Sequence, residues 1–296
     1  MMNNNTQFET NDSGTIEALC ELYITKHAEL KNKPSSVKLN RHLIQKHIIP
    51  YFAGRKITEI TSRDICEFQY HHRNTRTQAN RLLELLSKMF NLAEIWGLRE
   101  SGNPCRNIDR FKERIVTRFL SPEEIICLQK ELDRQKRTTP HAAAAIRLLL
   151  LTGCRKSEIL AMKWQDIDLR QGVLTLHDSK TGMRMVPLNH SALDVIKKIP
   201  RVGDCPYVIA NPRTGKGMND LNRTWRRVRK YTKLEDVRLH DLRHTFASRG
   251  VEAGLSLIVI SKLLGHKQLQ TTQRYAHLAF ADALAASNRI AGFMPH

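Results

Sequence analysis

The stretch AAAAIRLLLLTGCRKSEIL, residues 142–160, joins the most apolar run of the chain to a short polar turn. Its apolar part, residues 142–151, is interrupted by Arg147 and is too short to cross a bilayer, so it predicts a buried helix. The turn after it carries Arg155, and Glu158 lies one helical turn further on. An arginine beside a buried helix needs an anion. That anion is either Glu158 in a structural ion pair or a ligand toward which Glu158 orients the guanidinium.

The charge of the chain points to a polyanionic partner. Its 296 residues include 48 Lys and Arg but 29 Asp and Glu, which gives a formal net charge of +19. Most of the excess lies after residue 111. Such a field attracts nucleic acid or an anionic membrane surface. With 41% hydrophobic and 26% charged residues the chain can also bury sizeable cores, and its length predicts roughly two domains.

Composition also favours a location inside the cell. The first ten residues, MMNNNTQFET, are polar and lack the apolar core of a secretory signal. The six cysteines are scattered without a C-x-x-C pair, which argues against a zinc cluster or a disulfide framework. We therefore expect a cytoplasmic protein in a reduced compartment, without a membrane partner.

The domain organisation follows from helical periodicity and its interruptions. Residues 1–13 are polar and are expected to form a flexible arm. From residue 14 to 105 the apolar spacing is helical without a strand-like run, which predicts a small all-helical domain. The basic stretch 106–118 is typical of a linker. A second domain, 119–296, begins with the sequence SPEE at 121–124, a capping box with proline in the first helical position.

The second domain is expected to be mainly helical with a small antiparallel sheet. Two strand-like runs, residues 173–177 and 185–188, are joined by the turn sequence SKTG at 179–182, which is a hairpin signal. Lys180 would lie in that turn. Helical patterns return after the hairpin and continue to the C-terminus.

A basic helix face is predicted over residues 221–231. Four cationic side chains recur at helical spacing on one face, and apolar residues occupy the other. The cationic residues are Arg223, Arg226, Arg227 and Lys230, and the apolar ones are Leu221, Trp225 and Val228. The face is either an ordinary solvated surface or, in so basic a domain, a site of phosphate contact.

The sequence HDLRH at 240–244 admits several interpretations. His240 and His244 are spaced as in a zinc-binding helix, but no convincing third ligand follows and an arginine lies between them. Alternatively, His240 and Arg243 project from one turn as a phosphate clamp, because guanidinium and imidazole N–H groups both donate to phosphate oxygens. Taken alone, the motif favours a capped core helix over either kind of binding site.

Two further motifs follow toward the C-terminus. Residues 256–265 predict a helix with serine at its start and glycine just beyond its end, and His266 follows where a turn can aim it into a cleft or leave it on the surface. The sequence TTQRYAH at 271–277 contains Tyr275. A tyrosine on a short helix normally packs. It can be a nucleophile only beside a cationic pocket and a positioned phosphate, because its unperturbed pKa is about 10.

The order and combination of these motifs are far more specific than any one of them. The set Arg155, Lys180, His240, Arg243, His266 and Tyr275 resembles the catalytic set of the tyrosine recombinase (phage integrase) family. The strings TGCRKSEIL, HDLRHTFAS, LLGH and TTQRYAH resemble motifs of that family, and the resemblance covers essentially the whole chain from about Thr15. It implies an all-α, SAM-like core-binding domain over 14–105 and a catalytic domain with the DNA breaking-rejoining enzyme fold over 119–296.

The resemblance implies site-specific cleavage and rejoining of duplex DNA strands through a 3′-phosphotyrosyl bond to Tyr275. In this family the reaction needs no metal or nucleotide cofactor, and the sequence has no G-x-x-x-x-G-K-[ST] motif. Arg155 and Arg243 would stabilise charge on the non-bridging phosphate oxygens.

The remaining residues of the set have supporting roles by the same resemblance. His240 and His266 would add hydrogen bonds to the phosphate, and His240 is a candidate acceptor for the proton of Tyr275. Lys180 would protonate the leaving 5′-oxygen. Glu158 matches an acidic position beside the first arginine and would orient the cluster.

Double-stranded DNA is the partner that the family implies, together with accessory DNA-bending or directionality proteins and a nucleoid-associated location. Four protomers are expected at synapsis, because recombining two duplexes breaks four strands and each chain supplies one Tyr275. Residues 280–296 would pack on a neighbouring protomer, as tails in the family do, or on their own domain.

Two other functions use similar chemistry or the same fold. A type IB topoisomerase-like enzyme would relax DNA through a phosphotyrosine without exchanging partner strands, and a catalytically silent regulator would only bind DNA. The size of the chain and its integrase-like motifs favour a recombinase, and the intact catalytic set argues against a silent regulator.

Overall fold

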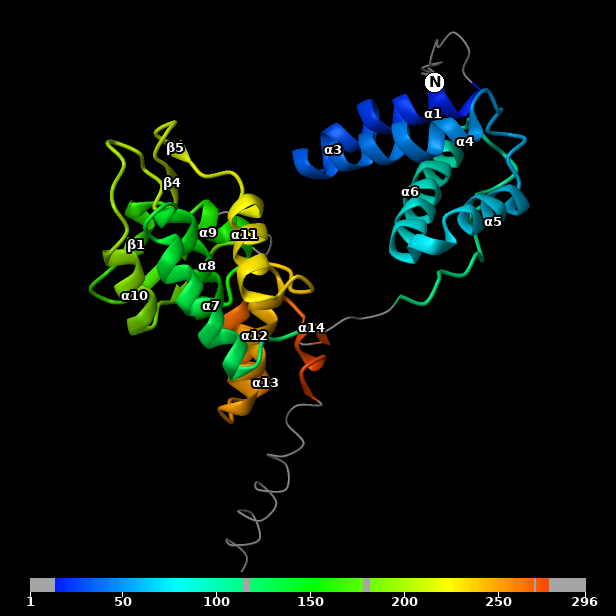
Figure 1. Cartoon of the computed structure of the whole chain (residues 1–296). Helices are drawn as coiled ribbons and strands as arrows, with labels where there is room; N and C mark the ends of the chain where they lie inside the picture. Colours follow the sequence, from blue (N-terminus) through cyan, green and yellow to red (C-terminus); the bar gives the residue numbers. More distant parts are fainter. Residues whose placement is uncertain (1–13, 114–117, 178–181, 269, 277–296) are drawn as a thin grey trace, which may run out of the picture. The chain divides into compact units, whose positions relative to one another are not determined.

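The computed structural model describes residues 14–113, 118–177, 182–268 and 270–276. The chain forms two compact units, the first ending at Ile115 and the second beginning at Val116, each with its own hydrophobic core (Figure 1). Among its described residues the first unit has helices and no strand, and the second adds small antiparallel sheets to its helices. The predicted fold class is thereby confirmed.

Helices of the first unit begin where the sequence supplies caps. The hydroxyl of Thr15 accepts from the backbone N–H of Ala18, and Thr61 and Asp64 form a reciprocal capping box. The helices are α1 (Ile16–Leu22), α2 (Glu29–Lys31), α3 (Pro34–Leu43), α4 (Ile49–Phe52), α5 (Ser62–His71) and α6 (Arg76–Ile95). The π-helical segments η1 (Tyr23–Ala28) and η2 (Ile44–Ile48) make α1 to α2 and α3 to α4 continuous, and the 3-10 turn η3 (Arg73–Thr75) precedes α6.

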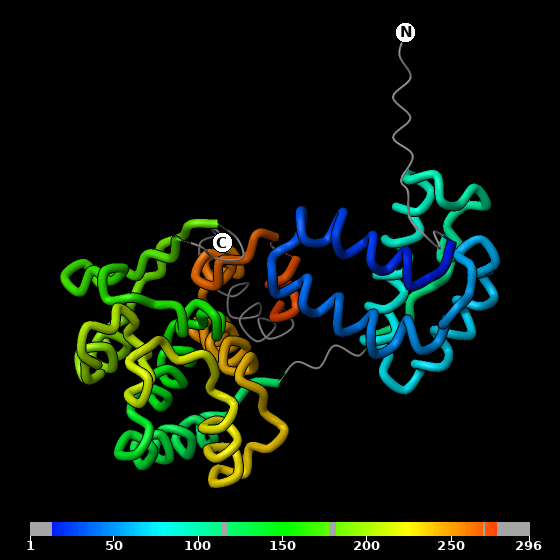
Figure 2. Tube along the Cα trace, turned by 90° about the horizontal axis from the view of Figure 1, so that it is seen from above, coloured from blue at the N-terminus to red at the C-terminus, as the bar shows by residue number. Residues whose placement is uncertain are grey.

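The core of the first unit forms between these helical stretches. Residues 16–31 and 34–52 run antiparallel and side by side (Figure 2), and the 20-residue α6 packs its apolar face with theirs and with α5. The chain after α6 then returns along the unit, because Asn80 donates to the carbonyl oxygen of Phe111 and Gln69 donates to that of Asp109. Part of the basic stretch expected to be a linker is therefore bound to the first unit.

A buried helix forms the centre of the second unit. The predicted apolar helix is confirmed as α8 (Pro140–Thr152), and it contacts α7, α9, α10, α11 and α12. The predicted capping box is confirmed at the start of α7. The helices are α7 (Pro122–Gln135), α9 (Lys156–Leu160), α10 (His190–Lys197), α11 (Asn222–Thr232), α12 (Asp241–Glu252), α13 (Leu257–Leu264) and α14 (Gln270–Gln273), with a 3-10 turn η4 (Trp164–Asp166).

Two small sheets lie in the second unit. The predicted hairpin is present as β2 (Val173–Leu176) and β3 (Arg184–Pro187), with β1 (Ile167–Asp168) on its other edge. Lys180, expected in the hairpin turn, lies outside the described residues. The second sheet, β4 (Ala210–Asn211) with β5 (Lys216–Gly217), was not predicted, because strands of two residues carry no alternating pattern.

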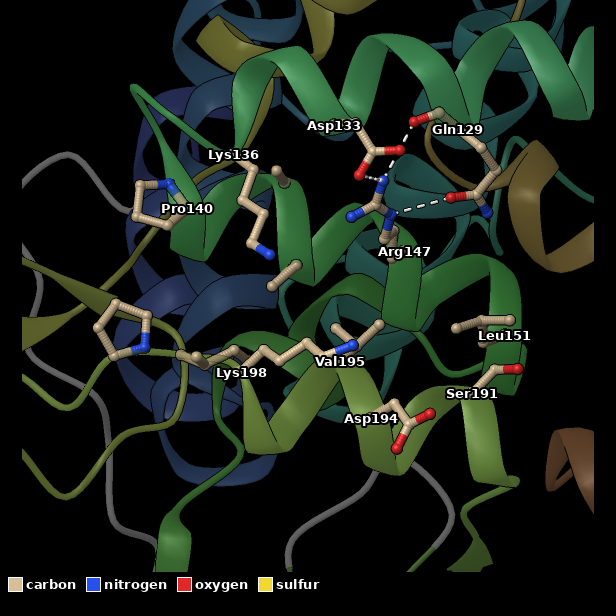
Figure 3. Close-up of a pocket in the computed structure, with 14 residues that line it drawn as sticks. Gln129, Asp133, Lys136, Pro140, Arg147, Leu151, Ser191, Asp194, Val195 and Lys198 are labelled. Atoms are coloured by element: carbon tan, nitrogen blue, oxygen red, sulfur yellow. Dashed lines mark hydrogen bonds and ion pairs between the residues drawn. The ribbon is translucent and has the colours of Figure 1, made fainter.

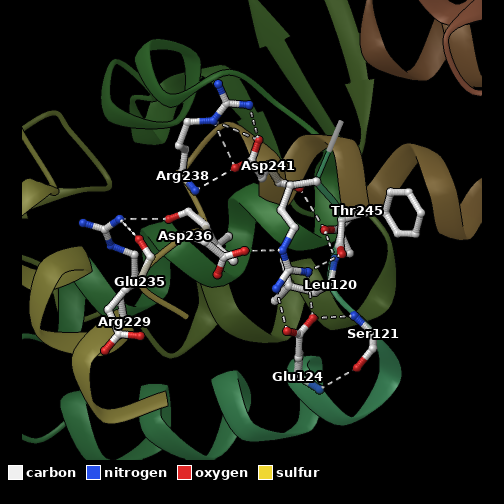
Figure 4. A network of polar contacts seen from close by, with 12 residues as sticks. Leu120, Ser121, Glu124, Arg229, Glu235, Asp236, Arg238, Asp241 and Thr245 are labelled. Atoms are coloured by element: carbon white, nitrogen blue, oxygen red, sulfur yellow. Dashed lines mark hydrogen bonds and ion pairs between the residues drawn. The ribbon is translucent and has the colours of Figure 1, made fainter. Parts of the chain in front are cut away.

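The start of α12 is held by a polar network (Figure 4). The carboxylate of Asp241 is fully buried and accepts from both the backbone and the side chain of Arg238. One turn along, Thr245 accepts from the backbone N–H of Leu120 at 3.0 Å. Arg118 adds ion pairs to Glu124 and Asp236. These contacts fix the helix that carries the HDLR motif.

Candidate active site

Three arginines converge on the C-terminal end of α13. The helix ends at Gly265, which has a left-handed φ of 65°, and the carbonyl groups of residues 263–265 would otherwise lack partners. Arg184 donates to the first of these oxygens at 3.1 Å, Arg243 to the second at 2.8 Å and Arg155 to the third at 3.4 Å. The negative end of the helix dipole favours the same cations. Segments far apart in the sequence therefore meet at one point.

Glu158 bridges two of these arginines. Its carboxylate is buried and accepts from the guanidinium of Arg155 at 2.7 Å, from the backbone N–H of Arg155 at 2.8 Å and from Arg184 at 2.9 Å. Burial alone would raise the pKa of Glu158, but the hydrogen bonds from Arg155 and the nearby Arg184 outweigh it and lower the pKa. Glu158 is therefore ionised at neutral pH, and the structural ion pair considered for Arg155 is present.

Arg243 is the most deeply buried of the three cations. Its side chain also donates to the carbonyl oxygen of Gly153 at 2.7 Å. Burial and, second, the charge of Arg155 lower the pKa of Arg243 to about 10, so it keeps its charge at neutral pH. Three guanidinium groups around the single carboxylate of Glu158 leave this cluster net positive, which suits an anionic ligand.

Two histidines flank the arginines. His240 is exposed just before α12, and partial desolvation and the charge of Arg243 lower its pKa. His266 follows Gly265 directly, and its Nδ1 lies 2.7 Å from the hydroxyl of Thr272. Burial, then Arg243 and Arg155, lower the pKa of His266 to about 4. In the neutral tautomer that carries its proton on Nε2, the imidazole accepts from Thr272 at Nδ1 and can donate to a ligand from Nε2.

Tyr275 is buried rather than presented to solvent. Its side chain is 1% exposed and packs among apolar residues of α12 and α13. Its hydroxyl lies 2.5 Å from Nδ1 of His244. Burial raises the pKa of Tyr275, although Arg274 and Arg243 act in the opposite direction. The hydroxyl is therefore protonated at neutral pH in this arrangement.

Sequence reasoning missed two residues of this site. His244 was considered only as a zinc ligand, whereas it is the hydrogen-bond partner of Tyr275, and burial lowers its pKa to about 4. No sequence spacing connects residues 31 positions apart. Arg184 had a usable signal, because it lies two residues from the buried Val186 on β3 and therefore shares its inward face. Within the described residues, no group of three His, Cys, Asp or Glu side chains could hold a metal ion.

The predicted basic helix lies beside the arginine cluster. A cavity of about 440 Å³ is lined by Arg243, His240 and Lys156 together with Asn222, Trp225 and Arg229 of α11. The four predicted cations of α11, Arg223, Arg226, Arg227 and Lys230, are exposed, and its apolar residues, Leu221, Trp225 and Val228, are buried. α11 therefore has the two faces that the sequence predicted, beginning one residue later than expected.

A second cavity lies away from these residues, between α7, α8 and α10 (Figure 3). It has a volume of about 420 Å³. Arg147 on its wall is already paired, at 2.8 Å with Asp133 and at 2.9 Å with Gln129. None of the predicted site residues lines it.

Comparisons with known proteins decide the family. The profile of the phage integrase family matches residues 118–282, and that of the phage integrase N-terminal SAM-like domain matches residues 15–71. The chain belongs to the phage integrase family. Together with its relatives, this makes the protein a site-specific tyrosine recombinase, an enzyme that transfers DNA strands. The comparisons favour neither a relaxing enzyme nor a silent regulator.

The similarity extends over most of the chain. The tyrosine recombinase XerC of Thermodesulfovibrio yellowstonii is 29% identical over 282 residues, covering 87% of this chain and 92% of the relative. The ICEBs1 integrase of Bacillus subtilis is 26% identical over 298 residues, covering 90% and 80%. A lambda integrase tetramer bound to a Holliday junction shares the fold, with a TM-score of 0.73 at 20% identity over 89% of this chain and 78% of that one. No helix in the described part of this integrase-family chain is long and apolar enough to span a membrane.

Proposed function

We propose that this recombinase cleaves duplex DNA with Tyr275 as the nucleophile and with Arg155 and Arg243 as the groups that stabilise the scissile phosphate. The observation that carries the proposal is the convergence of their guanidinium groups on the end of α13, directly before His266. Cations held by backbone carbonyls and by Glu158 need little reorganisation when negative charge develops on the phosphate. His240 and His266 add hydrogen bonds to the same oxygens.

The proposed reaction exchanges one phosphoester for another. The Tyr275 oxygen forms a bond to phosphorus, the bond from phosphorus to the 5′-oxygen breaks, and the DNA keeps a 3′-phosphotyrosyl link. Lys180, in the role that the family resemblance implies, donates the proton that the leaving 5′-oxygen needs. Attack by a 5′-hydroxyl of another duplex reverses these steps and joins the recombinant strand, so the bond energy is conserved without a nucleotide.

Tyr275 must change its surroundings before it can attack. Buried and hydrogen-bonded to His244, its hydroxyl cannot meet a phosphate on a DNA backbone. Movement of the side chain toward Arg155 and Arg243 would surround it with positive charge, which lowers a tyrosine pKa. The proton would pass to His240, as the family resemblance suggests, or to His244, which already contacts the hydroxyl.

Double-stranded DNA and three further copies of the chain are the proposed partners. The net charge of +19 and the exposed cations of α11 suit a phosphate backbone. A tetramer at synapsis follows from four broken strands and one Tyr275 per chain, and a lambda integrase with the same fold forms a tetramer on a Holliday junction. Residues 280–296, which lie outside the described residues, would join neighbouring protomers. Accessory DNA-bending proteins and a nucleoid-associated, cytoplasmic location complete the proposal.

Covalent trapping on DNA tests this function. Nicked duplexes tiled from the DNA that flanks the gene lose the short strand after cleavage, so the protein stays attached. We expect an adduct at one position, resistant to denaturing electrophoresis. Adducts spread over every duplex would indicate a relaxing enzyme instead. An adduct whose DNA is attached through its 5′ end would contradict the proposed polarity.

The basic face of α11 is expected to contact phosphates directly. Arg223→Gln combined with Arg226→Gln should weaken binding to a 30-base-pair duplex whatever its sequence. The slope of log affinity against log salt should fall by about 2, because each lost phosphate contact removes about 0.9. Fluorescence anisotropy over a salt series measures both. Lys197→Gln on α10 is the control. An unchanged slope in the double variant would show that this face of α11 does not contact phosphates.

A further inference from the structure

Arg184 ties three separate parts of the candidate site together. It lies on β3 and is 12% exposed. One nitrogen of its guanidinium, Nη2, donates to Glu158 at 2.9 Å, and the other, Nη1, donates to the carbonyl oxygen of Leu263 at 3.1 Å. Glu158 in turn holds Arg155. A single side chain thus connects the sheet, the start of α9 and the end of α13.

The turn that precedes His266 is built around the Arg184 side chain. A Cβ atom added at Gly265 would lie 2.7 Å from Cδ and Nε of Arg184 and 2.8 Å from its Cζ. Gly265 also has a left-handed φ, so glycine is required there for two independent reasons. The buried Nε of Arg184 has no hydrogen-bond acceptor among the described residues. The close packing of Arg184 on Gly265 therefore leaves one buried donor unpaired, which lowers the stability of the fold.

We propose that Arg184 is a positioning residue for strand cleavage, which holds Glu158 and the Gly265 turn so that Arg155 and His266 keep a fixed orientation toward the phosphate. This inference rests on the proposed roles of Arg155 and His266. Arg184 itself does not meet the DNA: two of its guanidinium nitrogens are taken by Glu158 and Leu263, and the third is covered by the turn.

Loss of Arg184 should therefore reduce the rate of cleavage without reducing the affinity for DNA. In Arg184→Ala, Glu158 loses one of its cations and the turn loses its support, so Arg155 and His266 sample several orientations. Residues that orient a catalytic group typically account for a 10–100-fold effect. We expect single-turnover cleavage of the trapped duplex to slow by about that factor, while the dissociation constant for DNA changes less than about twofold.

Two additional measurements separate positioning from a general structural role. Guanidinium ions at millimolar concentration should restore part of the rate to Arg184→Ala by occupying the vacated site, and should have no such effect on Met185→Ala, an exposed neighbour on the same strand. Gly265→Ala should slow the wild type strongly and slow Arg184→Ala by less, because the side chain it strikes is gone and only the strain of the left-handed φ remains. Additive losses would contradict the proposed contact.

A measurement without DNA keeps this inference separate from the proposed function. The pKa of His266, lowered to about 4 by burial and by Arg243 and Arg155, should rise in Arg184→Ala as the loosened turn admits water. Nuclear magnetic resonance of labelled imidazole rings follows that titration even if no duplex is cleaved. If Arg184→Ala does not fold, Arg184→Lys takes its place, because lysine keeps the charge and loses the two-armed contact. The pKa of His266 should then rise above its wild-type value in Arg184→Lys.

The role of Arg184 and the proposed function can therefore be contradicted independently of each other. An unchanged His266 titration together with a cleavage rate within about twofold of wild type would overturn the role of Arg184. A loss of DNA affinity as large as the loss of rate would place Arg184 on the DNA instead. Failure of the wild type to form any adduct, with a raised His266 pKa in the variant, would count against the proposed function and leave the positioning contact intact.

Discussion

Replacement of Tyr275 by phenylalanine is expected to abolish covalent attachment to DNA while leaving the fold and the DNA affinity nearly unchanged. Phenylalanine fills the same buried site in the apolar cluster but has no oxygen to bond to phosphorus. Loss of a nucleophile typically costs about 10⁴-fold or more. The readout is the rate of adduct formation on the nicked duplex that the wild type cleaves.

The hydrogen bond to His244 predicts a small cost in stability for the same variant. Removing the hydroxyl leaves Nδ1 of His244 without its partner, which should lower the free energy of unfolding by about 1 kcal/mol. Denaturant titration would detect that change, and anisotropy would establish that DNA is still bound. Adduct formation by Tyr275→Phe at more than about a hundredth of the wild-type rate would exclude Tyr275 as the nucleophile.

Arg243→Lys is expected to slow cleavage by about 10²–10³-fold with little change in DNA affinity. Arg243 holds the carbonyl oxygens of Gly153 and Leu264 with separate nitrogens and still has a further N–H group to offer a phosphate. A lysine ammonium is a single point of charge and cannot make those contacts together. Arg243 is buried and so adds little to the surface that binds the duplex. The loss should therefore appear in the cleavage rate when the DNA is saturated with protein.

Arg99→Lys is the matched control for this prediction. Arg99 is also buried and holds two carbonyl oxygens, those of Ile57 and Ile60, but it lies in the first unit and belongs to no proposed catalytic contact. It should change stability and leave the cleavage rate near that of wild type. A duplex with a neutral methylphosphonate at the cleaved position should narrow the gap between Arg243→Lys and wild type. Equal losses on both duplexes would argue that Arg243 does not stabilise phosphate charge.

Local features of the fold were predictable because each depends on a few neighbouring residues. The capping box at 121–124, the apolar helix before Gly153 and the two faces of α11 are all present, with ends shifted by a residue or two. The hairpin was predicted from alternation around a glycine-containing turn. The β4–β5 pair escaped prediction because its strands are too short for any period to show.

The order of the candidate site residues was readable from the sequence, but their contacts were not. Arg155 and the carbonyl group of Gly265 are 110 residues apart, and nothing local predicts that helix α13 ends against that guanidinium. The same holds for His244 and Tyr275. Such contacts are set by the packing of α12 on α8 and of α13 on α12, which is a property of the whole core. The burial of Tyr275 was likewise invisible in the motif TTQRYAH.

Identification of the residue joined to DNA is the most direct test of the central claim. The adduct trapped on a nicked duplex would be digested with protease and nuclease, and the cross-linked peptide sequenced by mass spectrometry. The account predicts a single nucleotide attached through its 3′-phosphate to the oxygen of Tyr275, in a peptide that contains QRY. Attachment to another residue, or through a 5′-phosphate, would contradict it.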